Sequence, residues 1–147
     1  MVYPTDHDCV WIASDSQSCV AVFITAGAAP IPSHLLQNDT IFGGIEELVW
    51  MLPEITEPRL LVNVARPDDY LAFAKRGLFV YDWTDIHRTQ KASINMYEMV
   101  AQPVKACSVA NISSDLTSTI VSITGKNFHF LENSTIKIDS YIQCARP

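Results

Sequence analysis

Basic residues are missing from the first part of this sequence: residues 1–58 contain neither Lys nor Arg. The same segment carries eight carboxylates, and the 147-residue chain has a formal net charge of −6. Because phosphate binding depends on clustered Lys and Arg, this distribution argues against nucleic acid as a partner. A basic protein is an expected partner, and the alternative is that the acidic residues only keep the chain soluble.

Long apolar runs are also absent. The longest strongly apolar stretch, residues 19–24, is far shorter than the roughly 20 residues that cross a bilayer. Residues 1–8 carry acidic groups where a secretory signal has basic ones. We therefore expect no membrane contact and a cytoplasmic location, and we interpret the sequons at Asn38, Asn111 and Asn133 as chance matches.

The four cysteines form no Cys-x-x-Cys pair, which excludes the usual zinc and thioredoxin-like spacings. A turn near residues 16–17 would place Cys9 opposite the region of Ile24 and away from Cys19. A disulfide between Cys9 and Cys19 would need a different strand register. We expect all four thiols, which include Cys107 and Cys144, to be free.

The composition favours one folded domain, residues 1–147. Hydrophobic residues make up 48% of the chain and charged residues 18%, which is the opposite of a disordered sequence. At this length a domain buries roughly 70% of the surface of its unfolded chain. The chain can therefore build a sizeable core.

The residue pattern predicts an α+β fold: a mostly antiparallel sheet of five or six strands with two main helices packed on it. Residues 8–13 and 19–26 form a predicted hairpin whose second strand is apolar on both faces. The predicted helices follow Asn38 or Asp39, ending before Pro53, and follow Pro67, ending at Gly77. Further strands are expected at 59–65, 78–81, 94–101, 128–131 and 135–141, and a short helix in preference to a strand at 115–124.

Catalytic and ligand-binding motifs are hard to find in the chain. Gly43-Gly44 has no Lys after it, so it lacks the spacing of a phosphate loop, and no Gly-x-Ser-x-Gly elbow occurs. The four histidines are scattered, and His7-x-Cys9 supplies only two soft metal ligands. We therefore expect no bound metal and no cofactor, and we favour a non-enzymatic protein.

The densest polar cluster is Asp82-Trp83-Thr84-Asp85-Ile86-His87-Arg88, directly after a predicted strand. Three interpretations stay open. The carboxylates cap a turn and Arg88 pairs with an acid; Trp83 and Arg88 contact a partner; or Asp85 and His87 do acid/base chemistry.

Several segments resemble a known kind of protein. Val-Trp-Ile-Ala-Ser-Asp at 10–15, Val-Ala-Val-Phe-Ile-Thr-Ala-Gly at 20–27, Pro-Ile-Pro at 30–32, the stretch 77–88 and Tyr-Glu-Met-Val-Ala-Gln-Pro at 97–103 resemble small uncharacterised bacterial proteins that look like immunity proteins encoded beside polymorphic toxins. The resemblance covers roughly residues 8–103 and includes no chemical signature. It implies a role in neutralising a toxin domain and transfers no catalytic residue.

The charge and the resemblance lead to one hypothesis: an immunity protein whose acidic surface binds and neutralises a cognate, basic toxin domain. The alternatives are a small cytosolic enzyme that uses the 82–88 cluster, and a structural or regulatory subunit with a large apolar face; the sequence leaves homodimerisation open. The predicted partner contacts are Glu46, Glu47, Glu54, Glu57, Asp68, Asp69, Asp82, Trp83, Asp85, His87 and Arg88.

Overall fold

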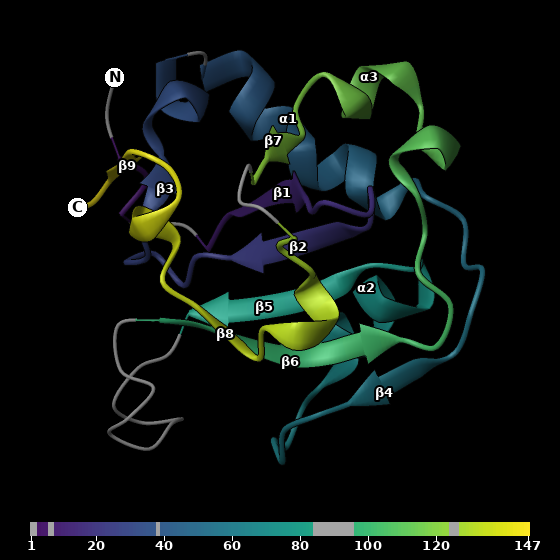
Figure 1. The fold of residues 1–147 in the computed structure, drawn as a ribbon. Coiled ribbons are helices and arrows are strands. Elements are labelled where there is room, and N and C mark those ends of the chain that lie inside the picture. The colour runs from purple at the N-terminus through teal and green to yellow at the C-terminus, as the bar shows by residue number, and fades with distance from the viewer. Residues whose placement is uncertain (1–2, 6–7, 38, 84–95, 124–126) are drawn as a thin grey trace.

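The computed structural model describes residues 3–5, 8–37, 39–83, 96–123 and 127–147, with the backbone alone for residues 39–43 (Figure 1). Its elements are β1 (Val10–Ser14), β2 (Val20–Ile24), β3 (Ile31–Pro32), η1 (Ser33–Gln37), α1 (Asp39–Trp50), β4 (Pro58–Leu60), α2 (Asp68–Lys75), β5 (Phe79–Trp83), β6 (Tyr97–Pro103), η3 (Val109–Asn111), α3 (Ser114–Thr117), β7 (Val121–Ser122), η4 (Phe130–Glu132), β8 (Thr135–Ile136), η5 (Ile138–Ser140) and β9 (Cys144–Ala145).

The fold is α+β, as predicted, and its main sheet is mixed. Within the described residues seven strands form this sheet, in the order β4-β6-β5-β2-β1-β7, with β8 also paired to β6. β2 runs parallel to β5, and β1 runs parallel to β7. The expectation of a mostly antiparallel sheet of five or six strands is therefore wrong. The connection from β2 to β5 contains both α1 and α2, and long crossovers of this kind join parallel strands.

The predicted hairpin is confirmed, and its turn is held by one carboxylate. β1 and β2 pair in the register Val10↔Ile24 through Ser14↔Val20. Oδ1 of Asp15 accepts the backbone N–H groups of Gln17 and Cys19 at 2.9 and 3.0 Å. The register sets Cys9 beside Thr25, whose N–H donates to the Cys9 carbonyl, and none of the four cysteines is disulfide-bonded, as predicted.

The core forms two layers, one on each face of the sheet. Ala21 and Phe23 of β2 face an aromatic layer in which Phe23 stacks on Trp11 and Tyr81, with ring centroids 4.3 and 5.0 Å apart. The alternate residues of β2, from Val20 to Ile24, pack with apolar side chains of α1 and α2. In Figure 1, α2 lies behind the sheet and the C-terminal segment with η4 crosses in front of it. β2 is thus the central, doubly covered strand that the sequence predicted.

The two main helices agree with the sequence. α1 ends before Pro53 and exposes Glu46 and Glu47, and α2 is followed by Gly77 with a φ of 87°. Glycine is preferred just after a helix when the residue there has a left-handed backbone conformation. No helix in the described part of the chain has both the length and the apolar character to cross a membrane.

Three of the strand predictions are partly wrong. The strand expected at 59–65 is three residues long, and the one expected at 128–131 is replaced by the 3₁₀ turn η4. The strand expected at 135–141 is limited to the two residues of β8 and is followed by the 3₁₀ turn η5. At 115–124 a single helical turn, α3, is followed by the short strand β7. The predicted helix and the alternative strand are therefore each present over part of the segment. Such short elements are decided by their tertiary neighbours more than by their own propensities.

Candidate functional site

A hollow of about 120 Å³ brings together side chains from separate parts of the chain. We name it the acidic hollow. It is lined by Asp8, Val10, Ile24, Glu46, Asp69, Tyr70, Phe73 and Asp82.

The strand register creates the floor of this hollow. Val10 of β1 pairs with Ile24 of β2, which in turn pairs with Asp82 of β5. Residues paired across neighbouring strands present their side chains on the same face of a sheet. The three side chains therefore form a row on the face that α1 and α2 cover, with the two apolar side chains followed by the Asp82 carboxylate.

The helices supply the remaining walls. Glu46 comes from α1, where the Trp50 indole N–H donates to its Oε2 at 3.3 Å. Asp69 lies in the first turn of α2, where the helix dipole favours a negative charge. Phe73, one turn further along α2, is buried against the sheet and stacks on Trp50 with ring centroids 4.2 Å apart. The two helices thus hold two carboxylates above an apolar base.

Asp8 and Asp82 are held by hydrogen bonds at this hollow. Oδ1 of Asp8 accepts the Ala26 N–H at 2.8 Å. Partial burial, with a smaller contribution from nearby Asp69, raises the pKa of the Asp8 carboxyl, and the Ala26 hydrogen bond opposes this shift. Asp82 is 9% exposed, accepts the Trp83 N–H at 2.8 Å and accepts the Tyr70 hydroxyl through Oδ2. Burial is thus the main cause of the raised Asp8 pKa, and the charge of Asp69 contributes less.

Among the described residues no Lys, Arg or His lines the acidic hollow. The ion pair recorded between described side chains, Arg146 with Asp139 at 2.6 Å, involves neither helix of the hollow. No group of three His, Cys, Asp or Glu side chains in the described ranges is placed to hold a metal ion. The charged residues among the described lining of the hollow are thus all carboxylates.

Three of the predicted contact residues, Glu46, Asp69 and Asp82, meet in the acidic hollow. Four others, Glu47, Asp68, Glu54 and Glu57, do not line it. Glu47 and Asp68 are exposed next to hollow residues on the same helices, Glu54 and Glu57 are exposed between α1 and β4, and Asp85, His87 and Arg88 lie outside the described residues.

Trp83 points to the opposite face of the sheet. It is 7% exposed, belongs to the aromatic layer and packs edge-on against Tyr97, with ring centroids 5.3 Å apart. Adjacent strand residues point to opposite faces, so Asp82 and Trp83 do not share a surface. The contact predicted for Trp83 stays a prediction.

Sequence reasoning did not single out Asp8, Tyr70 or the apolar base of the hollow. A signal for Asp8 was present, because a polar residue just before a strand lies at the rim of the sheet. The difference in charge between the parts of the chain before and after residue 58 did not predict where carboxylates gather on the surface. Asp8 and Glu46 come from the acidic first part, Asp69 and Asp82 come from the second, and Asp15 is used in the hairpin turn.

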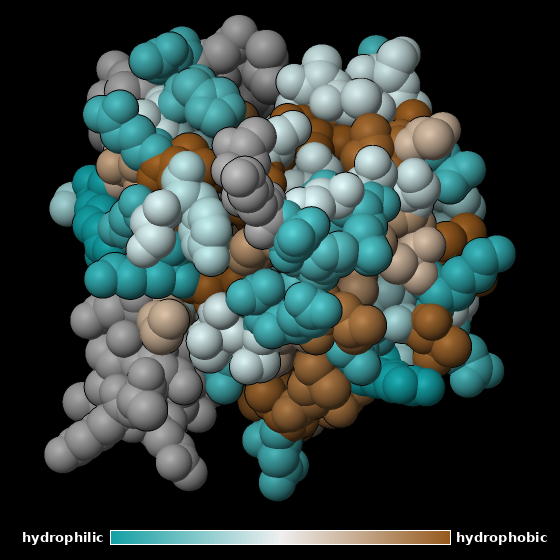
Figure 2. Space-filling view, viewed as in Figure 1, coloured by the Kyte–Doolittle hydropathy of each residue, from teal (hydrophilic) through white to brown (hydrophobic). Residues whose placement is uncertain are grey.

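The two alternative functions remain predictions. The enzyme hypothesis needs Asp85 and His87, which are not among the residues that the structure describes. The subunit hypothesis needs a large apolar face. Figure 2 shows apolar side chains gathered over β6 and β4, where Leu60 and Leu61 are exposed, with polar side chains around them.

Comparisons of this chain with protein-family models, with curated proteins and with solved structures found no match. The acidic hollow is therefore interpreted from its own chemistry.

Proposed function

We propose that this protein is a cytoplasmic immunity protein that binds a cognate, basic toxin domain, with the acidic hollow at the centre of the contact. The observation that carries the proposal is the convergence of Asp8, Glu46, Asp69 and Asp82 on one concave site. Complementary potentials accelerate encounter and select the correct partner.

The shape of the hollow supports a particular mode of contact. Its apolar base of Val10, Ile24 and Phe73 can pack against the methylene groups of a Lys or Arg side chain, while the carboxylates meet the charged end. An inhibitor that captures a basic side chain of the toxin active site would occlude that site without any catalysis of its own.

The experiment uses the purified protein and the product of the neighbouring gene, with association and dissociation rates measured by surface plasmon resonance. Glu46→Lys and Asp69→Lys reverse charges inside the hollow. Glu47→Lys and Asp68→Lys are matched controls, because each changes the net charge equally, one position along the same helix, at an exposed residue outside the hollow.

All four variants should slow association to a similar extent, because long-range attraction depends on total charge. The two hollow variants should in addition raise the dissociation rate about tenfold or more, which corresponds to about 1.4 kcal/mol of lost contact energy. Raised salt should slow association by the native protein, since the screening length is about 8 Å at physiological ionic strength.

The proposal fails if the neighbouring product is neither toxic nor bound. It also fails, in its placement of the interface, if the Glu47 and Asp68 variants dissociate as fast as the Glu46 and Asp69 variants.

A further inference from the structure

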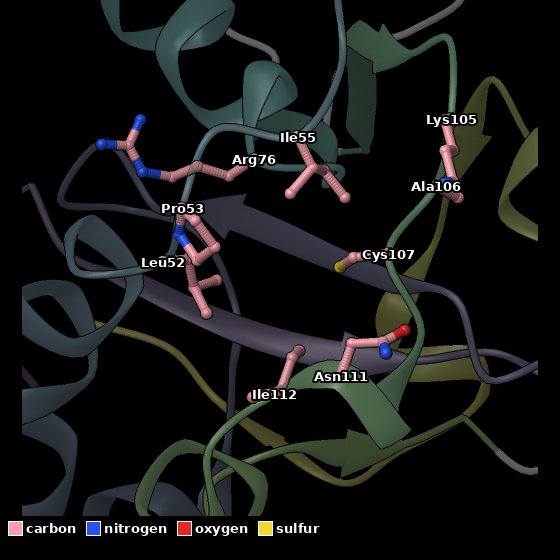
Figure 3. Close-up of a pocket in the computed structure, with 9 residues that line it drawn as sticks. All are labelled: Leu52, Pro53, Ile55, Arg76, Lys105, Ala106, Cys107, Asn111 and Ile112. Carbon is pink, nitrogen blue, oxygen red and sulfur yellow. The ribbon is translucent and has the colours of Figure 1, made fainter.

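A second, larger cavity of about 270 Å³ lies away from the acidic hollow (Figure 3). It opens between the loop after α1, the end of α2 and the segment from Lys105 to Ile112. None of its lining residues belongs to the acidic hollow. For scale, an apolar cavity of roughly 150 Å³ accepts benzene, so this one has room for a larger apolar group.

The walls of this cavity are fixed by hydrogen bonds between its three segments. The N–H groups of Ile55 and Thr56 both donate to the Lys75 carbonyl, at 2.8 and 3.1 Å. The Lys105 N–H donates to Oγ1 of Thr56 at 2.9 Å, and the Cys107 N–H donates to the Gly77 carbonyl at 2.9 Å. A site held open in this way loses little conformational entropy when a ligand binds.

Apolar side chains surround the cavity. Figure 3 shows Leu52 and Ile55, from the loop after α1, and Cys107 and Ile112, from the segment Lys105 to Ile112, arranged around the same space. Cys107 is 6% exposed, and burial raises the pKa of its thiol to about 11, so it contributes a neutral wall. The Asn111 amide is the neutral polar side chain among the described lining residues, and the apolar remainder suits a ligand whose body is hydrocarbon.

The charged lining residues of this cavity are both cations. In Figure 3 Arg76 and Lys105 lie on opposite sides of the space, and among the described lining residues there is no carboxylate. The Arg76 guanidinium is held in place by the carbonyls of Ala72 and Trp50, at 2.8 and 3.2 Å, and lies over the Trp50 ring. Lys105 is exposed at the rim. The described lining of this cavity is thus positive, although the chain as a whole has a net charge of −6.

We infer that this cavity is a binding site for a small apolar carboxylate, with the hydrocarbon part among Leu52, Ile55 and Ile112 and the carboxylate at the Lys105 side of the rim. Burial of the hydrocarbon chain supplies the affinity, and Lys105 at the rim decides the sign of charge that is accepted. This site is independent of the proposed toxin interface.

Octanoate is the probe, with 1-octanol and octylamine as neutral and cationic molecules of the same chain length. Binding is followed by NMR through the methyl signals of Leu52, Ile55 and Ile112, which locate the ligand in this cavity. Octanoate should shift these signals with a Kd of about 0.1–1 mM, as expected for a ligand of about ten non-hydrogen atoms.

Lys105→Gln tests the role of charge, because it removes an exposed cation and leaves the backbone hydrogen bond to Thr56 in place. It should weaken octanoate binding about three- to fivefold and leave 1-octanol binding unchanged. Lys137→Gln, which removes an exposed lysine outside the cavity, should change neither.

The inference is overturned if octanoate leaves the three methyl signals unshifted at 10 mM, or if 1-octanol or octylamine binds as tightly as octanoate. It is also overturned if the Lys137 variant weakens octanoate binding as much as the Lys105 variant does.

Discussion

Replacing Gly77 with alanine should destabilise this protein strongly, because the backbone at Gly77 allows no side chain. Its φ of 87° lies in the left-handed region, where a residue with a Cβ costs about 1–2 kcal/mol. A Cβ placed there would lie 2.7 Å from the Cys107 nitrogen, 2.8 Å from its Cβ and 2.9 Å from Cδ1 of Ile55. Both neighbours line the larger cavity, so the substitution would also distort that site.

The size of the effect follows from these contacts. Forcing extra atoms into a packed region costs about 1–3 kcal/mol, and the Cys107 backbone cannot move away freely, because its N–H is bonded to the Gly77 carbonyl. The lower entropy of the unfolded variant returns about 0.4–1 kcal/mol. The net loss should be about 2–4 kcal/mol, or about 6–12 °C in melting temperature.

Gly44→Ala is the matched control. Gly44 lies inside α1, and among the described residues a Cβ built there meets no atom within 4 Å beyond its chain neighbours and the backbone of its own helix. Alanine is favoured over glycine in a helix by about 1 kcal/mol, so this variant should melt about 2–3 °C higher than the native protein.

Urea unfolding followed by tryptophan fluorescence measures both variants. The reasoning about Gly77 is refuted if Gly77→Ala unfolds within about 0.5 kcal/mol of the native protein, the range of an ordinary surface change. The two substitutions are expected to have opposite signs, so a shift in the same direction for both would also refute it.

Two further predictions concern buried and crowded polar groups. Tyr97→Phe should cost about 1–3 kcal/mol in urea unfolding, because the fully buried hydroxyl accepts the Trp11 indole N–H at 3.1 Å and donates to a backbone carbonyl at 2.9 Å. Tyr141→Phe, at a residue that is 41% exposed, should stay within about 0.5 kcal/mol, and equal losses for the two would contradict the assignment. Asp8→Asn should stabilise the fold near neutral pH. Because the pKa of Asp8 is raised in the folded state, its protonated carboxyl contributes to the stability of the fold. This contribution is lost as the pH rises through the folded-state pKa. The gain in free energy of unfolding of the Asn variant, measured at several pH values, should shrink toward pH 3. A gain that increases toward pH 3 would contradict this prediction.

Local sequence patterns predicted the structure correctly where the residues of a single helix or hairpin determine its conformation. The apolar residues of 19–26, with turn residues before them, predicted the hairpin and its register. Pro53 and Gly77 marked the ends of the two helices, because proline cannot continue a helix and glycine tolerates a positive φ. The same patterns failed at 59–65 and 128–131, where β-branched and aromatic residues occur in segments whose conformation depends on neighbouring elements.

The candidate sites were less accessible to the sequence than the fold. Glu46, Asp69 and Asp82 were singled out for their charge, but nothing in their spacing indicated that Asp8 would join them. That convergence depends on the parallel pairing of β2 with β5, which sets Ile24 beside Asp82. The larger cavity likewise depends on the approach of Gly77 to Cys107, between residues thirty positions apart.

The sequence by itself determined the α+β class, the hairpin, the central strand and the two main helices. These properties depend on hydrophobic period, capping residues and turn residues, which act over a few positions of the chain. Only the tertiary structure decided the mixed direction of the sheet, the meeting of four carboxylates from distant segments and the cationic rim of the second cavity. Long-range strand pairing and helix packing set these positions, and their energies come from contacts between residues that no local pattern brings together.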